Sequence, residues 1–380
     1  MKILIAPDSF KESLTATEVT RSIKQGISMA IPDAQCIELP LADGGEGTVD
    51  ALVNAIGGSI IKVKVKDPLM RDIEAYFGIL GDKTTAVIEM AAASGLELLK
   101  DKERNPMKTT TFGTGQLIRA ALDEGCKNFI IGIGGSSTND GGAGMAQALG
   151  VHFLDKHHNE LPVGGGNLSS LEYIIDDKID SRIKKCKVTV ASDVNNPLFG
   201  REGATRIYGP QKGATPEMVE KLESNLKHYG AKLEDKFQEK FVNLPGAGAA
   251  GGMGIGLVAF LNAELRPGFE IIKELTGLED ILKGVDLVVT GEGKMDEQTI
   301  FGKTPQGVAS LAKRFNKPVI GIAGSLGLNY QELYHHGFDV LVSIIDSPMT
   351  LDKALSDADE LLRNVSFALF RIISIGENLK

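Results

Sequence analysis

Strand-like and helix-like segments alternate at both ends of the 380-residue chain, and this alternation constrains the fold more than any other feature. Near the N-terminus, an apolar run is followed by Val19, Ile23 and Ile27 at helical spacing. Strands that alternate with helices predict a parallel sheet with crossover helices. Five runs read as strands: Lys2 to Phe10, Cys36 to Gly47, Asp286 to Gly293, Pro318 to Ser325 and Asp339 to Asp346. The expected helices include Thr48 to Ile56, Pro305 to Phe315 with Thr304 as N-cap, and Thr350 to Leu369.

The middle of the chain has a different pattern. Ile60 to Leu69, Glu74 to Leu80 and Thr84 to Ala91 are strand-like, with almost no helix between them. We therefore predict an α/β fold in which a flavodoxin-like domain with a parallel five-stranded sheet is discontinuous and carries an inserted second α/β domain built on a mixed sheet. The predicted limits are residues 1–60 and 265–380 for the split domain and 61–264 for the insertion.

Composition narrows the class of protein. The net charge of −9 and the pI of about 5.3 argue against nucleic acid or an anionic membrane as the main partner. Cys36, Cys126 and Cys186 are far apart and form neither a disulfide framework nor a zinc pattern, which fits a reducing compartment. No apolar run approaches the length of a membrane span, and no signal segment precedes the first strand. We expect a cytoplasmic protein.

The stretch from Phe129 to Gly144 combines a strand, a turn rich in glycine and hydroxyl groups, and the start of a helix. Small side chains in such a turn let backbone N–H groups approach a phosphate, and the helix start adds attraction. A tight turn capped by Asn139 or Asp140 is the alternative, and this stretch alone leaves it open. The candidate phosphate-binding residues are Gly134, Gly135, Ser136, Ser137, Thr138, Asn139, Asp140, Gly141 and Gly142.

Acidic residues beside small residues repeatedly follow predicted strands. Because ligands bind outside the carboxyl ends of parallel strands, these acids should converge at one edge of a sheet. A metal or general-base site is one interpretation, and separate helix caps are the other. The positions are Asp8 with Ser9, Asp43 and Glu46 around Gly44 and Gly45, Asp193, Glu292 and Asp296.

Three lysines lie in or beside glycine-containing or polar turns. Lys11 follows Asp8 and Ser9, Lys212 lies in GPQKGAT, and Lys303 lies in GKTP. A lysine in such a turn suits phosphate charge, and a solvated surface lysine is the alternative. The GKT sequence is not a P-loop, because position 297 is a glutamate where that motif requires glycine.

The glycine spacing of a dinucleotide-binding motif also occurs in the chain. Gly246, Gly248 and Gly251 match G-x-G-x-x-G, but the preceding segment is a weak strand and no acid-ended strand follows at the right distance. A glycine-rich entry to a helix from Ile255 to Leu265 is therefore the favoured interpretation. The six histidines show no metal-binding spacing.

Seven motifs, in order along essentially the whole chain, resemble the bacterial glycerate kinase family. They are DSFKESL (Asp8 to Leu14), ADGGEGT (Ala42 to Thr48), TTTFGTGQLI (Thr109 to Ile118), IGGSSTNDGGAGM (Ile133 to Met145), DVNNPLFG (Asp193 to Gly200), GPQKGAT (Gly209 to Thr215) and VTGEGKMDEQT (Val289 to Thr299). The resemblance implies a flavodoxin-like domain, an inserted mixed α/β domain and an active site in the cleft between them. It also implies phosphoryl transfer from ATP to D-glycerate at the 2-hydroxyl, giving 2-phosphoglycerate, in glycerate, glyoxylate and sugar-diacid catabolism.

Phosphoryl transfer needs positioned reactants, cations on the phosphates and a base or orienting group for the attacking hydroxyl. We expect the ATP phosphates on the 134–142 loop with Lys212, and Mg²⁺ on one or two of Asp43, Glu292 and Asp296. Lys11 and Lys303 should hold the glycerate carboxylate or neutralise the moving phosphoryl group. The expected catalytic residues are Asp193 as base, Lys11 and Asp296. The expected substrate-binding residues are Asp8, Ser9, Lys11, Gly44, Gly45 and Lys303.

Three other functions stay open on the sequence. They are a glycerate 3-kinase, a nicotinamide-dependent oxidoreductase acting on a hydroxy acid, and a non-catalytic sugar-acid sensor. The expected partners are small molecules, D-glycerate and ATP, without nucleic acid or membrane, and a homodimer is left open.

Overall fold

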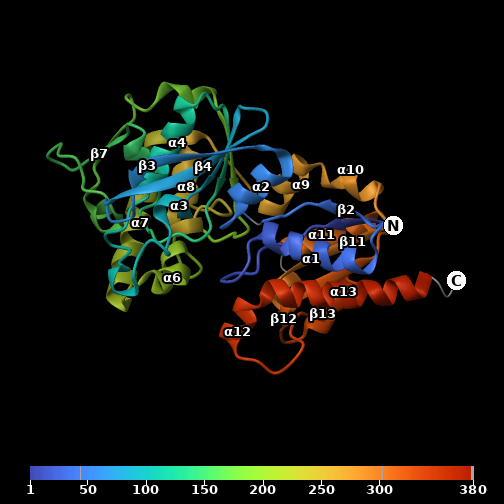
Figure 1. Ribbon diagram of the computed structural model, residues 1–380. Helices are drawn as coiled ribbons and strands as arrows, with labels where there is room; N and C mark the ends of the chain where they lie inside the picture. Colours follow the sequence, from blue (N-terminus) through green and yellow to red (C-terminus); the bar gives the residue numbers. More distant parts are fainter. Residues whose placement is uncertain (43, 301–302, 378–380) are drawn as a thin grey trace. The chain divides into compact units, whose positions relative to one another are not determined.

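The computed structural model describes residues 1–42, 44–300 and 303–377, and the chain divides into two compact units (Figure 1). Unit 1 comprises Met1–Asp43, Asp50–Gly57 and Phe269–Lys380, and unit 2 comprises Gly44–Val49 and Gly58–Gly268. That the two units are independently folding domains with limits at residues 60 and 265 stays a prediction.

Unit 1 is built on a five-stranded parallel sheet, which confirms the predicted fold class. The strand order is β13-β12-β11-β1-β2, and the register pairs Leu4 with both Ile37 and Val288. Read from β2, this is the flavodoxin-like order 2-1-3-4-5. The strands are β1 (Lys2–Ile5), β2 (Gln35–Glu38), β11 (Leu287–Met295), β12 (Val319–Leu326) and β13 (Val340–Ser343). The first two are shorter than predicted, because the polar ends of both predicted runs lie in loops.

Helices α1 and α13 lie side by side in unit 1 (Figure 1) and bury residues such as Val19, Ile23 and Phe370 against the sheet. Helix α11 packs on β11 and β12. Two predictions were wrong in detail: the C-terminal helix breaks in two at Asp357, and Lys303, rather than Thr304, is the N-cap of α11. The helices are α1 (Ala16–Ala30), α2 (Thr48–Ile56), α9 (Gly268–Thr276), α10 (Leu278–Lys283), α11 (Thr304–Arg314), α12 (Leu351–Ser356) and α13 (Ala358–Glu377), of which α2 and α9 begin with residues of unit 2.

Unit 2 carries the predicted mixed sheet. Its six strands follow the order β10-β9-β6-β5-β4-β3, with β3, β4 and β5 antiparallel and the others parallel. The strands are β3 (Gly58–Lys66), β4 (Asp72–Leu80), β5 (Thr85–Glu89), β6 (Asn128–Gly132), β9 (Lys187–Ala191) and β10 (Glu264–Arg266). A separate antiparallel pair is formed by β7 (His152–Leu154) and β8 (Tyr173–Ile175).

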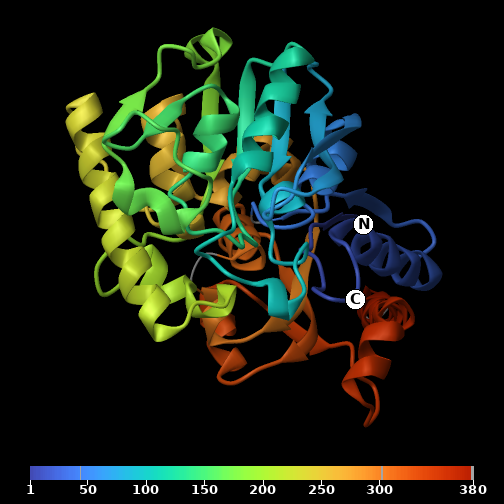
Figure 2. The same cartoon turned by 90° about the vertical axis from the view of Figure 1, so that its left-hand side faces the viewer.

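The core of unit 2 lies between its sheet and its helices, and it includes Phe77, Ile88 and Leu117. Figure 2 shows the long α7 in yellow-green along one side of this unit. The helices are α3 (Ala91–Ser94), α4 (Phe112–Asp123), α5 (Ala143–Ala148), α6 (Ala204–Tyr208), α7 (Pro216–Phe237) and α8 (Ala249–Leu261).

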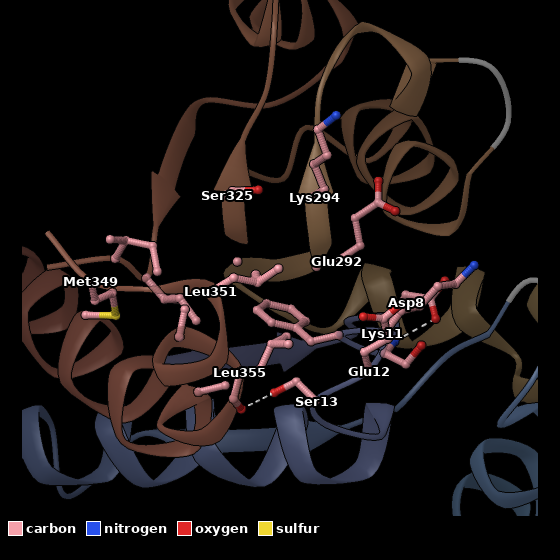
Figure 3. Close-up of a pocket in the computed structure, with 18 of the residues that line it drawn as sticks. Asp8, Lys11, Glu12, Ser13, Glu292, Lys294, Ser325, Met349, Leu351 and Leu355 are labelled. Carbon is pink, nitrogen blue, oxygen red and sulfur yellow. Dashed lines mark hydrogen bonds between the residues drawn. The ribbon is translucent and has the colours of Figure 1, made fainter. Parts of the chain in front are cut away.

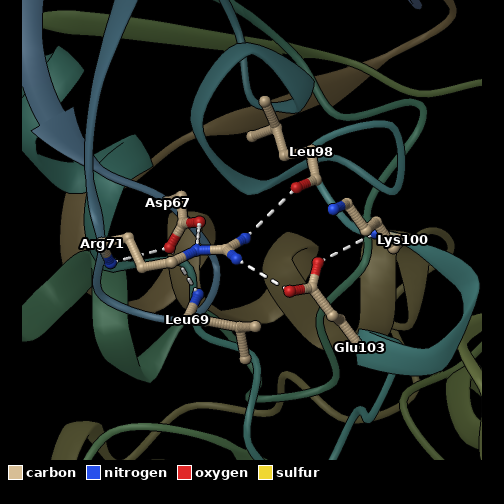
Figure 4. A network of polar contacts seen from close by, with 6 residues as sticks. All are labelled: Asp67, Leu69, Arg71, Leu98, Lys100 and Glu103. Carbon is tan, nitrogen blue, oxygen red and sulfur yellow. Dashed lines mark hydrogen bonds and ion pairs between the residues drawn. The ribbon is translucent and has the colours of Figure 1, made fainter.

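A buried carboxylate fixes the turn between β3 and β4 (Figure 4). Asp67, 1% exposed, accepts hydrogen bonds from the backbone N–H groups of Leu69 and Arg71, each at 2.8 Å. The Arg71 guanidinium pairs with Asp67 and reaches Glu103 Oε1 at 2.9 Å. The ordered turn then accepts the Thr110 N–H at Pro68 O, 3.0 Å away, which holds the segment that contacts the 134–142 loop.

Candidate active site

A pocket of about 710 Å³ opens in unit 1 outside the carboxyl ends of β1, β11, β12 and β13 (Figure 3). This is the edge at which parallel α/β sheets bind ligands. The pocket brings together five predicted site residues, all from segments that follow or end strands. These are Asp8, Ser9, Lys11, Glu292 and Lys303.

The pair of Glu292 and Lys303 lies at one side of this pocket. Glu292 Oε2 accepts a hydrogen bond from Lys303 Nζ at 3.0 Å, and Oε1 accepts one from Thr299 Oγ1 at 2.8 Å. Burial raises the pKa of Glu292, even though Lys303, Thr299 and Lys11 act in the opposite direction. The Lys303 side chain is 40% exposed, so its ammonium group can reach a ligand without leaving its carboxylate partner.

A tight turn after β1 presents Lys11. The Phe10 and Leu14 backbones exchange two hydrogen bonds of 2.9 Å, and Glu12 between them has a φ of 64°, which is uncommon for a residue other than glycine. Ser13 Oγ donates to Leu355 O at 2.7 Å, which joins the turn to α12. The turn is therefore held by these hydrogen bonds, and it leaves the Lys11 side chain exposed at the pocket.

Asp296 is not among the residues that line the pocket, although its partner Lys294 is. Its Oδ2 lies 2.9 Å from Lys294 Nζ, and its Oδ1 accepts the Gln298 N–H at 2.9 Å. Burial pushes the pKa of Asp296 upward, but Lys294 and the Gln298 N–H together hold it below its usual range. Asp43, the third predicted metal ligand, lies outside the described residues. Among the residues that are described, no group of three or more His, Cys, Asp or Glu side chains could hold a metal ion.

The 134–142 loop of unit 2 is turned inward. Ser136 to Asp140 are buried, whereas Gly134 and Gly135 are exposed. Ser137 Oγ donates to Ser94 O at 2.9 Å, and Asn139 Nδ2 donates to Thr205 Oγ1 at 3.0 Å. The side-chain donors of Ser137 and Asn139 are thus bound within unit 2, whereas Thr138 Oγ1 is buried without a hydrogen-bond partner among the described residues.

Lys212 is part of the same inward arrangement. Its side chain is 1% exposed, and Nζ donates to Ser136 Oγ and to Thr138 O, each at 2.7 Å. Burial lowers the pKa of Lys212 to about 7, although the charge of Asp140 opposes this shift. The Lys212 ammonium group therefore links two residues of the 134–142 loop from its buried side.

Asp140 is the common acceptor of this region. Its Oδ2 accepts the Thr111 N–H at 2.8 Å and the hydroxyl groups of Thr110 and Thr111 at 3.1 and 3.0 Å. Its Oδ1 accepts the Gly142 N–H at 3.2 Å. Burial raises the pKa of this carboxyl, while the Thr111 and Gly142 hydrogen bonds act against the rise. Asp140 therefore holds this turn through its hydrogen bonds, and phosphate binding by the 134–142 loop stays a prediction.

The predicted substrate-binding glycines lie against the ends of two unit 2 strands. A Cβ atom added to Gly132 would fall 2.1 Å from Gly44 O, and one added to Gly134 would fall 3.0 Å from Gly45 Cα. The backbones can approach this closely only because the positions lack side chains. Gly44 and Gly45 are therefore neighbours of the exposed start of the 134–142 loop.

Asp193 follows β9, as expected, and it is exposed. Its Oδ1 accepts the Gly268 N–H at 2.9 Å, where α9 begins. Similarly, Oε1 of Glu89, at the end of β5, accepts a hydrogen bond of 2.7 Å from the N–H of Val49 near the start of α2. Glu89 was not singled out from the sequence, because its partner lies forty positions away.

The three glycines of the G-x-G-x-x-G match are packing positions. A Cβ atom on Gly248 would lie 2.1 Å from Pro197 O, and one on Gly251 would lie 2.0 Å from Thr138 O. Gly251 also has a φ of 70° within a non-helical kink near the start of α8, and the helix ends at Leu261 rather than at the predicted Leu265. Close packing accounts for these glycines.

The apolar side of the unit 1 pocket was missed. Phe10, Ile344, Met349, Leu351 and Leu355 line it, and none was assigned to a site from the sequence. The available signal was the spacing of Leu351 and Leu355, which place two apolar side chains on one face of a helix.

Comparisons with known proteins agree with the motifs. The sequence model of the glycerate kinase family matches residues 3–374. A glycerate kinase of Halalkalibacterium halodurans is 49% identical and covers 96% of each chain. The glycerate 2-kinase of Escherichia coli is also 49% identical, over 99% of each chain. A crystal structure of a glycerate kinase 2 candidate from Salmonella typhimurium LT2 is 50% identical, with a TM-score of 0.90, and covers 100% of this chain and 99% of that one. The chain therefore belongs to the glycerate kinase family.

Proposed function

We propose that this protein transfers the γ-phosphoryl group of ATP to the 2-hydroxyl of D-glycerate and releases 2-phosphoglycerate. The observation that carries the proposal is the pocket of unit 1, which places Lys11 and Lys303 beside Glu292 at the ligand-binding edge of the sheet. The regiochemistry rests on the Escherichia coli relative, which is named a glycerate 2-kinase.

The charges of the pocket suit this chemistry. Phosphoryl transfer depends on positioning and on cations that neutralise the phosphate oxygens, with little covalent work for the protein. We assign the ammonium groups of Lys11 and Lys303, both in the pocket lining, to the phosphates or to the glycerate carboxylate. Asp8 and Ser9 lie at the same pocket and complete the substrate-binding set from unit 1.

Unit 2 contributes two further parts in this proposal. Asp193 acts as the base for the glycerate hydroxyl, supported by its exposure at the end of a strand. The 134–142 loop contributes through the backbone of Gly134 and Gly135, since these positions are exposed while Ser136 to Asp140 are not. Lys212 and Asp140 act on the ligand through the shape of this loop.

Mg²⁺ belongs to the proposal as the ion that accompanies ATP. Magnesium sites at nucleotides typically use one or two carboxylates, with phosphate oxygens and water as the remaining ligands. Glu292 fits as such a carboxylate because it lies in the pocket and is only partly neutralised by Lys303. Asp43 and Asp296 remain candidate ligands.

The test is an assay with ATP, Mg²⁺ and D-glycerate coupled to enolase. We expect the absorbance of phosphoenolpyruvate to rise without added mutase, because 2-phosphoglycerate is the enolase substrate. A signal that requires phosphoglycerate mutase would instead establish 3-phosphorylation. If neither coupling detects an ATP-dependent product, the kinase proposal is rejected. Binding of glycerate without turnover would then indicate a sensor.

The proposed partners are these small molecules. No helix among the described residues is long and apolar enough to cross a membrane. The net charge of −9 disfavours nucleic acid. Cytoplasmic location is part of the proposal, and light scattering decides whether the protein forms a homodimer.

A further inference from the structure

The unit 1 pocket has two chemically different sides (Figure 3). Met349, Leu351 and Leu355 lie on one side, and Glu292 and Lys294 lie on the other. A three-carbon acid such as glycerate would use only a small part of the volume of about 710 Å³. Pockets of about 300–1,000 Å³ typically enclose ligands of drug size, which includes nucleotides.

The apolar side is formed largely by one short helix. Leu351, Ala354 and Leu355 recur at helical spacing in α12 and line the pocket, and Ala358 at the start of α13 lines it as well. Leu351 is nevertheless 70% exposed, and Ile345, which also lines the pocket, is 38% exposed. Within unit 1 these side chains therefore lack the apolar cover that a core residue has.

Hydrogen bonds fix this side in place. Thr350 Oγ1 accepts the Lys353 N–H at 3.4 Å as the N-cap of α12, and Ser13 Oγ binds Leu355 O at 2.7 Å. Phe10, which is 3% exposed, forms the floor from the same turn that carries Lys11. The apolar wall and the lysine turn are thus held at a fixed spacing.

The charged side supplies three ammonium groups at the opposite end. Lys294 and Lys303 each have one carboxylate partner, Asp296 and Glu292. No ion pair of Lys11 Nζ is found among the described residues, although the charge of Lys11 acts on Glu292. A ligand that matches the apolar wall and these ammonium groups carries a flat, weakly polar group at one end and several negative charges at the other, although Asp8, Glu12 and Glu292 also line the pocket.

We propose that the adenine base of ATP lies against Met349, Leu351 and Leu355, and that its phosphates extend to Lys11, Lys294 and Lys303. This inference rests on the proposed kinase function and assigns its nucleotide to unit 1. Methionine and leucine side chains adapt to a flat ring, and lysines bind phosphate as point charges. The Gly134 and Gly135 backbone of unit 2 then serves the transferred group rather than the base.

The experiment measures the binding of ADP and of inorganic tripolyphosphate by calorimetry, without glycerate. Tripolyphosphate has one phosphate more than ADP and lacks the base. In Leu351→Glu we expect the Kd for ADP to rise about tenfold or more and the Kd for tripolyphosphate to change less than about threefold. Lys353→Glu is the matched control: it lies on the same helix, is exposed, is absent from the pocket and changes the charge by more. Its Kd for ADP should stay within about twofold of the wild type.

Several outcomes overturn the inference. They are an unchanged Kd for ADP in Leu351→Glu, an equal loss of affinity for ADP and tripolyphosphate, or no binding of ADP to the wild type. Because Leu351 is largely exposed, the variant should fold, and circular dichroism checks this. Leu351→Ala is the milder second variant, with an expected rise in the Kd for ADP of about threefold.

Failure of this inference and failure of the proposed function are distinguishable. A wild type that phosphorylates glycerate, with a KM for ATP that Leu351→Glu leaves unchanged, keeps the function and rejects the base site. A wild type that binds ADP with the predicted response to Leu351→Glu but phosphorylates no glycerate keeps the base site and rejects the function.

Discussion

Two regions of this molecule share a sequence pattern, a lysine in a turn near glycines and hydroxyl groups, but they differ in solvent exposure. In unit 1, Lys303 is 40% exposed and Lys11 is exposed at an open pocket. In unit 2, Lys212 is 1% exposed and already donates to Ser136 and Thr138. An exposed ammonium group can exchange water for phosphate, whereas a buried one has exchanged its water for protein oxygens.

The same contrast holds for the carboxylates. Glu292 lies at the pocket with one lysine and one hydroxyl partner, while Asp140 accepts hydrogen bonds from two threonines and two glycine N–H groups. We infer that unit 1 uses its charged turns to bind a ligand and that unit 2 uses its own to shape a loop. The predictions below test this difference.

The largest expected effect would show that unit 2 also contributes chemistry. Asp193→Asn keeps an oxygen that can accept the Gly268 N–H, so the fold should stay intact, but it removes the charge of the proposed base. We expect kcat to fall by about 10²–10⁴ in the enolase-coupled assay. Glu202→Gln, at an exposed position nearby in sequence, is the control and should retain wild-type turnover. Near-normal turnover of Asp193→Asn would remove Asp193 from the base role.

The next effect concerns stability. Asp140→Ala leaves the buried Thr110 and Thr111 hydroxyl groups and the Thr111 N–H without their acceptor. We expect the free energy of unfolding, measured with urea, to fall by about 3 kcal/mol. Asp140→Asn retains one acceptor oxygen, so its free energy of unfolding should fall by less than that of Asp140→Ala. If Asp140→Ala kept its unfolding free energy and lost only kcat, Asp140 would belong to the chemistry and the contrast between the units would fail.

Lys11→Ala should affect binding without affecting stability. A hydrogen bond to a charged group contributes about 1.5–3 kcal/mol, so we expect the KM for glycerate or ATP to rise about tenfold or more. The unfolding free energy should change by less than about 0.5 kcal/mol, because the side chain is exposed. Lys353→Ala provides the matched change at an exposed lysine outside the pocket lining. Unchanged kinetics for both substrates would place Lys11 outside the site.

Much of unit 1 could be predicted from the sequence because its information is local. Most of its strands are short apolar runs, and Asp8 and Lys11 stand shortly after a strand, while Glu292 lies in the last part of β11. Parallel strands bring their carboxyl ends to one edge, so Asp8, Lys11 and Glu292 meet although the last is far from the others in sequence. The positions of these residues relative to the predicted strands are therefore enough to predict that they share a site.

The inward loop of unit 2 could not be predicted in this way. Ser137, Asn139 and Asp140 find their partners at Ser94, Thr205 and Thr111, in segments far from the loop. In the sequence, a buried polar residue that is hydrogen-bonded within the protein looks the same as one that binds a ligand. The apolar wall could not be predicted either. The helix break at Asp357, which separates α12 from α13, has no proline or glycine to indicate it in the sequence.

The smallest expected effect tests the burial of Lys212 through pH. Burial lowers its pKa to about 7, from an ordinary value near 10.5, so between these values the folded protein holds fewer protons than the unfolded chain. Raising the pH through this window must therefore stabilise the folded state, and the stabilisation is absent in Lys212→Met. From pH 7 to pH 8 we expect the unfolding free energy of the wild type to gain about 1 kcal/mol relative to the variant, in parallel urea titrations. A difference that stays constant with pH would mean that Lys212 remains charged when folded. Unit 2 would then keep a cation beside Ser136 and Thr138, and its turn would be as suited to phosphate as those of unit 1.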